Sequence, residues 1–146
     1  MGAEAVVGVD YSTRMIEIAQ QHAKEQGVES RCQFVAGNVL EYQGEERFDY
    51  VVAMGVMDYI SEPIPFLRHL ISLSRGKVML SFPAAGGILE WQRRLRYRWF
   101  SHCELTFYTR EDLRRLLEEV APGRWEIEPI ARDFFVNIEL GEPSLS

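Results

Sequence analysis

The chain has 146 residues, enough for one domain with a single hydrophobic core. Its apolar fraction of 47% and charged fraction of 26% are ordinary for a soluble globular protein, and no apolar stretch reaches the roughly 20 residues that span a bilayer. The net charge of −6 gives no strong indication of nucleic-acid binding, because proteins that bind nucleic acids usually have a basic surface. The two isolated cysteines suit a reducing compartment, so we expect a cytoplasmic protein without a transmembrane segment.

The chain opens on an apolar run at residues 6–9, which predicts a buried strand. The pattern that follows predicts a helix over 12–26, with Ser12 as its N-cap and Gly27 taking the left-handed exit conformation. The apolar face predicted for this helix comprises Met15, Ile18, Ala19 and His22.

Strand-like and helix-like segments continue to alternate through the middle of the chain. Further apolar runs predict buried strands at residues 32–37, 48–55 and 77–83. A helix is predicted within 63–75, capped by Ser61 and ended by Gly76. Alternation of this kind is typical of βαβ units around a parallel sheet.

The last third predicts a helix followed by a hairpin. Residues 108–123 have an amphipathic helical pattern, and Thr109 with Asp112 forms a capping box at its start. The strands at 124–130 and 133–140 have a very short connection, which favours antiparallel pairing. The predicted fold class is therefore α/β, with a sheet closed by a C-terminal antiparallel hairpin.

Small and polar residues follow the first strands in turn. Asp10 follows the first strand, Gly37 and Asn38 follow the second, and Met54 and Gly55 follow the third. In a parallel sheet these ends open onto one edge, where open α/β sheets bind their ligands. An acid after such a strand also suits the ribose of a nucleotide.

At these strand ends the chain resembles the class I S-adenosylmethionine-dependent methyltransferases, which have a Rossmann-like sheet. The segments that carry the resemblance, in the order of the family, are VVGVDYSTRMIEIA, FVAGNVLEY, FDYVVAMGVMDYI and YTREDLRRLLEEV followed by the terminal hairpin. The resemblance covers essentially the whole chain. It implies S-adenosyl-L-methionine as the cofactor and methyl transfer to an acceptor as the reaction.

The resemblance implies a cofactor site along the predicted edge. Asp10 would accept hydrogen bonds from the ribose hydroxyls, although an acid here can also stabilise the start of the helix. Asn38 stands where the family usually has Asp; its amide oxygen can accept a bond from the adenine amino group, or merely favour a turn. The implied cofactor residues are Asp10, Tyr11, Met15, Asn38, Val39, Met54 and Gly55.

Residues 84–107 interrupt the alternation and look like a substrate lid, since variable insertions of this kind usually select the acceptor in the family. The stretch 91–100 interleaves arginines with aromatic residues, which suits an acidic substrate, anionic lipid headgroups, RNA or simply a solvated helix. We expect a small-molecule or lipid-like acceptor. The candidate substrate-side residues are Asp58, Tyr59, Arg96, His102 and Tyr108. No histidine has metal-ligand spacing, so no metal is predicted.

The resemblance also implies an element that this chain lacks. The family places a first strand and its glycine-rich loop between the strands at 6–9 and 49–53, and residues 1–5 are too short to supply them. We therefore expect an incomplete single domain over 1–146, with exposed strand edges prone to self-association. Cofactor binding and activity of the chain alone are expected to be impaired.

Alternative functions stay open beside the methyltransferase. A non-catalytic remnant or partner subunit would bind no cofactor while forming a defined complex. An NAD-type nucleotide-binding protein would also use Asp10 for a ribose, although the terminal hairpin argues against it. The acceptor is not identified by the sequence.

Overall fold

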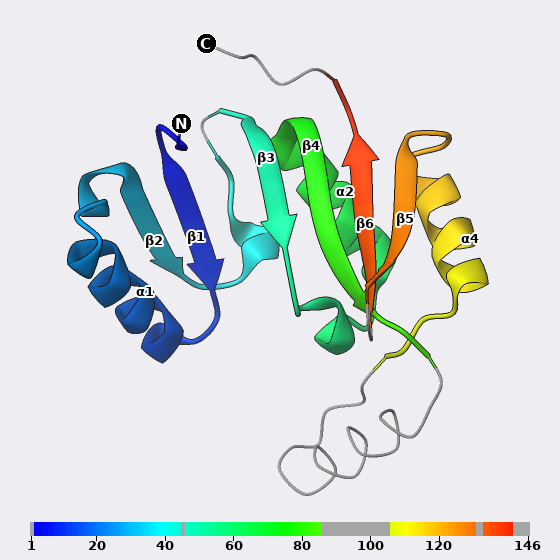
Figure 1. The fold of residues 1–146 in the computed structure, drawn as a ribbon, viewed down its shortest axis with the longest axis horizontal. Coiled ribbons are helices and arrows are strands. Elements are labelled where there is room, and N and C mark those ends of the chain that lie inside the picture. The colour runs from blue at the N-terminus through cyan, green and yellow to red at the C-terminus, as the bar shows by residue number, and fades with distance from the viewer. Residues whose placement is uncertain (1, 45, 86–105, 131–132, 142–146) are drawn as a thin grey trace, which may run out of the picture. The chain divides into compact units, whose positions relative to one another are not determined.

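The computed structural model describes residues 2–44, 46–85, 106–130 and 133–141, and the chain divides into two compact units, Met1–Gly44 and Glu45–Ser146. The first unit contains a two-stranded parallel sheet of β1 (Val6–Asp10) and β2 (Cys32–Ala36). The helix α1 (Thr13–Glu25) connects the strands and packs against both (Figure 1). The register pairs the last residue of β1 with the last of β2, so the two carboxyl ends coincide.

Local signals fix the ends of α1 as predicted. The Ser12 hydroxyl accepts a hydrogen bond from the Met15 amide at 3.3 Å, and Gly27 follows the helix with φ of 66°. The predicted apolar face was right for Ile18 and Ala19, which are half-buried, and wrong for Met15 and His22. Ile16 and Ala23 are the buried residues of this helix, whereas Met15 is 51% exposed and His22 is also exposed. The stripe that packs on the strands is the one that carries the β-branched and small side chains.

The second unit contains a four-stranded mixed sheet in the order β3-β4-β6-β5. Its strands are β3 (Phe48–Ala53), β4 (Ser74–Pro83), β5 (Trp125–Ile130) and β6 (Asp133–Glu139). The β3–β4 pair is parallel, and β6 is antiparallel to both β4 and β5. The α/β fold and the C-terminal antiparallel hairpin are thereby confirmed.

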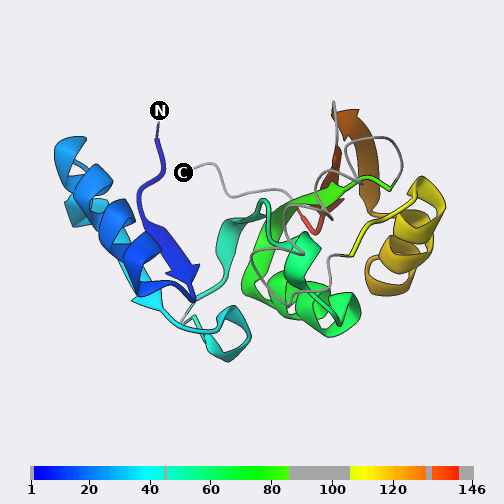
Figure 2. The same cartoon turned by 90° about the horizontal axis from the view of Figure 1, so that it is seen from below.

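Two helices cover one face of this sheet. Figure 2 shows α2 (Pro63–Leu73) and α4 (Arg110–Val120) on the same side of the strands, and the two helices contact each other. Alternate residues of the strands point into the space between sheet and helices, as the period of a strand requires. The fully buried side chains of this core are Met57, Leu67, Val78, Leu80, Phe82, Leu113, Leu117, Val136 and Ile138.

The boundaries of α2 differ from those predicted, whereas the start of α4 agrees. Glu62, not Ser61, is the N-cap of α2, and it makes no side-chain capping bond. The helix ends at Leu73 and β4 begins at once, so Gly76 lies within a strand rather than ending a helix. Pairing of β4 with β3 already begins at Ser74, and these sheet hydrogen bonds replace a last helical turn.

The two edges of the larger sheet have different characters. β5 forms one edge and carries Glu126, Glu128 and Pro129, which are residues that discourage further strand pairing. β3 forms the other edge, and its Tyr50 and Val52 are 49% and 57% exposed. In the part of the chain that the structure describes, β3 pairs only with β4, and β1 only with β2.

Candidate functional site

Asp10 closes the turn that leads from β1 into α1. Its Oδ1 accepts a hydrogen bond from the Ser12 amide at 2.7 Å, and its backbone carbonyl accepts one from the Gly37 amide at 2.9 Å. The second bond ties together the carboxyl ends of β1 and β2. The residue is exposed, and within residues 2–44 its Oδ2 carries no hydrogen bond. One carboxylate oxygen thus holds the turn while the other remains open to a donor.

Asn38 has a local capping role at the end of β2. Its Oδ1 accepts a hydrogen bond from the Leu40 amide at 2.9 Å, and its Nδ2 donates to Glu41 Oε1 at 3.5 Å. These bonds start a single 3₁₀ turn over Val39–Glu41. A carbonyl oxygen has two lone pairs, so Oδ1 keeps the capacity for a second donor.

Exposed apolar side chains surround these polar groups. Tyr11 is 75% exposed and Met15 is 51% exposed, so neither belongs to the core. Leu40, which sequence reasoning missed, is 45% exposed in the turn that Asn38 caps. Val39 beside it is half-buried. The carboxyl edge of the first unit therefore combines hydrogen-bond acceptors with exposed apolar side chains.

The second unit has its own arrangement at the carboxyl ends of β3 and β4. Met54 is 44% exposed, and Gly55 adopts φ of 68°, the left-handed conformation that favours glycine. The Gly55 amide donates to Ser81 Oγ at 2.8 Å, which links the exit of β3 to β4. Ser81 was not predicted, because a single hydroxyl within an apolar strand is not a distinctive signal.

Some predicted substrate-side residues also meet at this end of the second unit. Asp58 and Tyr59 lie in a single 3₁₀ turn after β3, and the Asp58 carbonyl accepts a hydrogen bond from the Thr106 amide at 3.1 Å. The Tyr108 amide donates to the Pro83 carbonyl at 3.0 Å, beside the end of β4. Asp58 and Tyr108 are therefore neighbours of the strand ends. Arg96 and His102 lie outside the described residues.

The side chain of Tyr108 is buried, with 6% of the residue exposed. Its ring packs edge-to-face on Phe82, with ring centroids 5.1 Å apart. Burial and then the charge of Asp58 raise the pKa of the phenol above its ordinary value of 10.0. The hydroxyl is therefore neutral at physiological pH.

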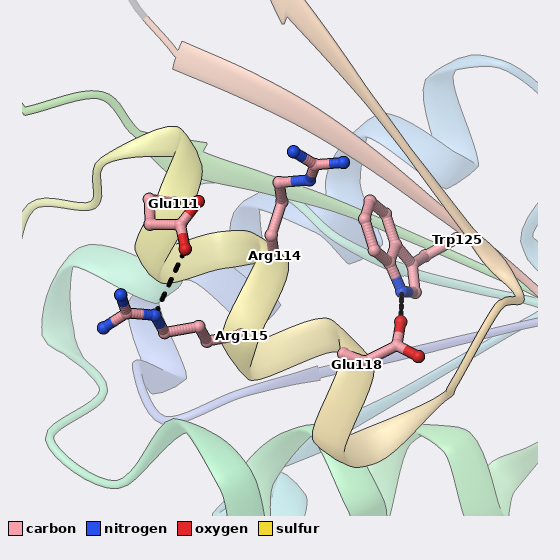
Figure 3. Close-up of a pocket in the computed structure, with 5 residues that line it drawn as sticks. All are labelled: Glu111, Arg114, Arg115, Glu118 and Trp125. Atoms are coloured by element: carbon pink, nitrogen blue, oxygen red, sulfur yellow. Dashed lines mark hydrogen bonds and ion pairs between the residues drawn. The ribbon is translucent and has the colours of Figure 1, made fainter.

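A shallow hollow of about 310 Å³ lies elsewhere, between α4 and β5. Figure 3 shows its lining, in which Glu118 accepts a hydrogen bond from the Trp125 indole at 3.0 Å and Glu111 pairs with Arg115 at 3.3 Å. Both acids are engaged within the protein. None of the predicted site residues lines this hollow, so it is separate from the candidate site.

The described residues contain neither a cluster of metal-ligating side chains nor a helix that could span a membrane. Over residues 2–44, 46–85, 106–130 and 133–141, His, Cys, Asp and Glu side chains do not gather in a group able to hold a metal ion. Within the same ranges every helix is too short or too polar to cross a bilayer.

Comparison with known proteins places the chain among methyltransferases. Residues 1–119 match the family described as "Methyltransferase domain". The ubiquinone biosynthesis O-methyltransferase of Ruegeria pomeroyi is 25% identical over 150 residues, which cover 93% of this chain and 56% of that protein. The enzyme of the same name from Azorhizobium caulinodans is 32% identical over 114 residues, which cover 68% of this chain and 44% of that protein. The chain thus spans about half the length of these relatives.

Solved structures establish the fold. Magnesium protoporphyrin IX methyltransferase from Synechocystis, solved with bound SAH, superposes with a TM-score of 0.71 at 19% identity, covering 94% of this chain and 64% of that one. The S-adenosylmethionine-dependent methyltransferase SibL gives a TM-score of 0.75 at 16% identity, covering 95% of this chain and 43% of that one. The match over residues 1–119 shows that this chain belongs to the methyltransferase-domain family, and the strand order and terminal hairpin agree with the fold of these structures.

Proposed function

We propose that the protein is an S-adenosylmethionine-dependent methyltransferase. The observation that carries the proposal is the carboxyl edge of the first unit, where Asp10 keeps one carboxylate oxygen open beside exposed Tyr11 and Met15. A carboxylate suits a vicinal diol, since each charge-assisted hydrogen bond contributes about 1.5–3 kcal/mol. The family match and the fold support the same cofactor.

Each residue of this edge has a role in the proposal. Asp10 binds the ribose hydroxyls, and Tyr11 and Met15 form apolar walls for the nucleoside. Asn38 accepts a bond from the adenine amino group through the second lone pair of Oδ1, with Val39 beside it.

In the second unit, Met54 and Gly55 are proposed to contact the methionine portion of the cofactor. The positive φ of Gly55 leaves no side chain over its backbone, which allows a ligand to approach closely. The bound cofactor supplies an activated methyl group on a sulfonium. The protein's task is then to hold the acceptor nucleophile in line with that methyl group, and no metal is required.

The acceptor is proposed to be a small-molecule or lipid-like compound with a hydroxyl group. The named O-methyltransferase relatives support this class. Asp58, Tyr59 and Tyr108 would face the acceptor, and Arg96 and His102 from the lid-like segment 84–107 belong to the same proposal by sequence.

Isothermal calorimetry of the 146-residue chain with SAH and with NAD tests the cofactor assignment. SAH binding without NAD binding is the expected result, because the family match and the fold support an S-adenosylmethionine cofactor. Binding of NAD alone would replace the proposal with a nucleotide-binding protein of another class.

A second candidate, a non-catalytic partner subunit, is favoured by the open β3 edge. Val52 is 57% exposed on that edge, whereas the opposite edge is protected by charges and a proline. We propose that β3 pairs with a further strand, from a second copy or another chain, and that the chain alone binds cofactor weakly. A monomer with a low-micromolar affinity for SAH would contradict this candidate.

Two matched substitutions test whether the chain associates through the β3 edge. Val52→Lys is expected to reduce concentration-dependent association in sedimentation experiments, because a charge on an edge strand discourages pairing. Ile130→Lys is the control, since Ile130 is 51% exposed on the protected strand β5. Equal effects of the two substitutions would mean that association does not use β3.

A further inference from the structure

A hydroxyl side chain interrupts the apolar carboxyl end of β4. Its neighbours Leu80 and Phe82 are fully buried, whereas Ser81 is half-buried. β4 lies between β3 and β6 in the sheet, and Ser81 pairs with Phe135 of β6. The backbone that carries this hydroxyl is therefore held in place by the sheet.

The register of the sheet puts Ser81 where β3 ends. Ala53 and Leu80 are the last residues that pair between the parallel strands β3 and β4, and Ser81 is the next residue of β4. Its Oγ accepts a hydrogen bond from the Gly55 amide at 2.8 Å. Gly55 is exposed, so water could accept from this amide as well. The bond is not needed to satisfy a buried donor, and its effect is to fix the chain after β3.

The turn after β3 is open to a ligand and needs such a constraint. Gly55 has φ of 68°, and glycine has more conformational freedom than any other residue. In the described part of the chain, a Cβ atom at Gly55 would meet no atom within 4 Å outside the adjoining residues, so the space beside it is free. On the far side of the turn, the Met57 side chain is fully buried. Ser81 and Met57 thus order the turn on folding, which lowers the entropy that ligand binding would otherwise lose.

We infer that Ser81 is a positioning residue for the cofactor. By fixing the backbone of Gly55, it raises the affinity for the methionine portion of S-adenosylmethionine and for the matching homocysteine portion of SAH. The inference rests on the proposed function, in which Met54 and Gly55 contact that portion. Ser81 acts through Gly55, and no bond is made or broken at its oxygen.

The experiment titrates the 146-residue chain with SAH and with adenosine, which lacks the homocysteine portion, and follows binding by NMR. Ser81→Ala is expected to weaken SAH binding about fivefold, the loss that one hydrogen bond represents, and to leave adenosine binding unchanged. Ser81→Thr keeps the hydroxyl and should bind SAH as the wild type does. Ser72→Ala, which removes an exposed hydroxyl from α2, is the control and should change neither affinity.

Hydrogen exchange of the Gly55 amide reports on the turn itself. Exchange should be faster in Ser81→Ala than in the wild type, and Ser81→Thr should restore the slower rate, because the amide regains its acceptor. Faster exchange together with unchanged SAH affinity would overturn the inference, since the bond would then order the turn without any effect on the ligand.

The ligand pair separates this inference from the proposed function. Equal weakening of SAH and adenosine in Ser81→Ala would overturn the inference alone, because Ser81 would then be a structural residue of the sheet. Wild-type binding of adenosine that is as tight as that of SAH would also overturn it, because the turn would not contact the homocysteine portion. A wild-type chain that binds neither ligand would refute the proposed function, and the inference with it.

Discussion

Arg75 on β4 holds Asp49 on β3 through two parallel hydrogen bonds, from Nε to Oδ1 at 2.8 Å and from Nη2 to Oδ2 at 3.0 Å. This bidentate geometry is the strongest that an arginine and a carboxylate form. Hydrogen bonding to Asp49, followed by its charge, raises the pKa of Arg75. The pair fastens the two parallel strands near the start of β3.

Asp49→Asn is expected to lower the melting temperature by a few degrees at low salt and by less at high salt. Both side chains are partly exposed, so the ion pair is weakened by solvent and by screening. Differential scanning calorimetry at two ionic strengths measures the effect. Glu17→Gln is the control, because its pair with Arg14 is longer and more exposed. A decrease in melting temperature that does not depend on salt would mean that Asp49 stabilises the protein by packing rather than by its charge.

Asp10→Ala is expected to weaken SAH binding by about 2–4 kcal/mol, because the ribose loses a charged acceptor. Competition calorimetry gives the affinity. The substitution also removes the acceptor of the Ser12 amide, so circular dichroism must show that α1 is retained. Glu4→Ala is a suitable control for the loss of a nearby negative charge in the first unit. An unchanged affinity would remove Asp10 from the site.

Asn38→Asp should leave SAH binding equal or make it tighter. A carboxylate caps the 3₁₀ turn as well as the amide does, and it is a stronger acceptor for the adenine amino group. Asn38→Ala, which removes both functions, provides the contrast. If Asn38→Asp weakens SAH tenfold, the Nδ2 donor is what matters at this position.

Thr109→Ala is expected to cost about 0.5–2 kcal/mol of stability at neutral pH, because it breaks the capping box of α4. Hydrogen bonds from the Thr109 side chain and backbone lower the pKa of Asp112 below its ordinary value of 3.8. A lowered folded-state pKa means that this stabilisation is complete above the unfolded value and is lost as the pH falls through the folded value. Urea denaturation should therefore show the difference between wild type and Thr109→Ala shrinking below about pH 3.8. Ser72→Ala, which removes an exposed hydroxyl from α2 and no carboxylate partner, should show no such trend.

Elements with local signals were predictable from the sequence. The capping box of α4 depends on residues three positions apart, and the hairpin of β5 and β6 depends on a short connection between two apolar runs. The boundary between α2 and β4 was not predictable in this way. It depends on pairing between Phe48 and Ser74, which are distant in the chain.

The same distinction between local and long-range signals applies to the residues of the candidate site. Asp10 and Asn38 were identified because they directly follow apolar strands, and the register of β1 and β2 brings those strand ends together. Ser81 and Leu40 were missed, because a polar residue within a strand and an apolar residue in a turn have no distinctive pattern. The hydrogen bond between Gly55 and Ser81 is a property of three-dimensional packing alone.

The parallel bridge between Ala84 and Tyr108 has an evolutionary consequence. Ala84 and Tyr108 form a parallel bridge, so the chain leaves the core and returns to it at one point. Lengthening a loop between fixed ends costs little, about 0.6 kcal/mol for each doubling of its length. The number of residues between Ala84 and Tyr108 can therefore change during evolution at little cost in stability, while the strands and helices on either side of the bridge keep their packing.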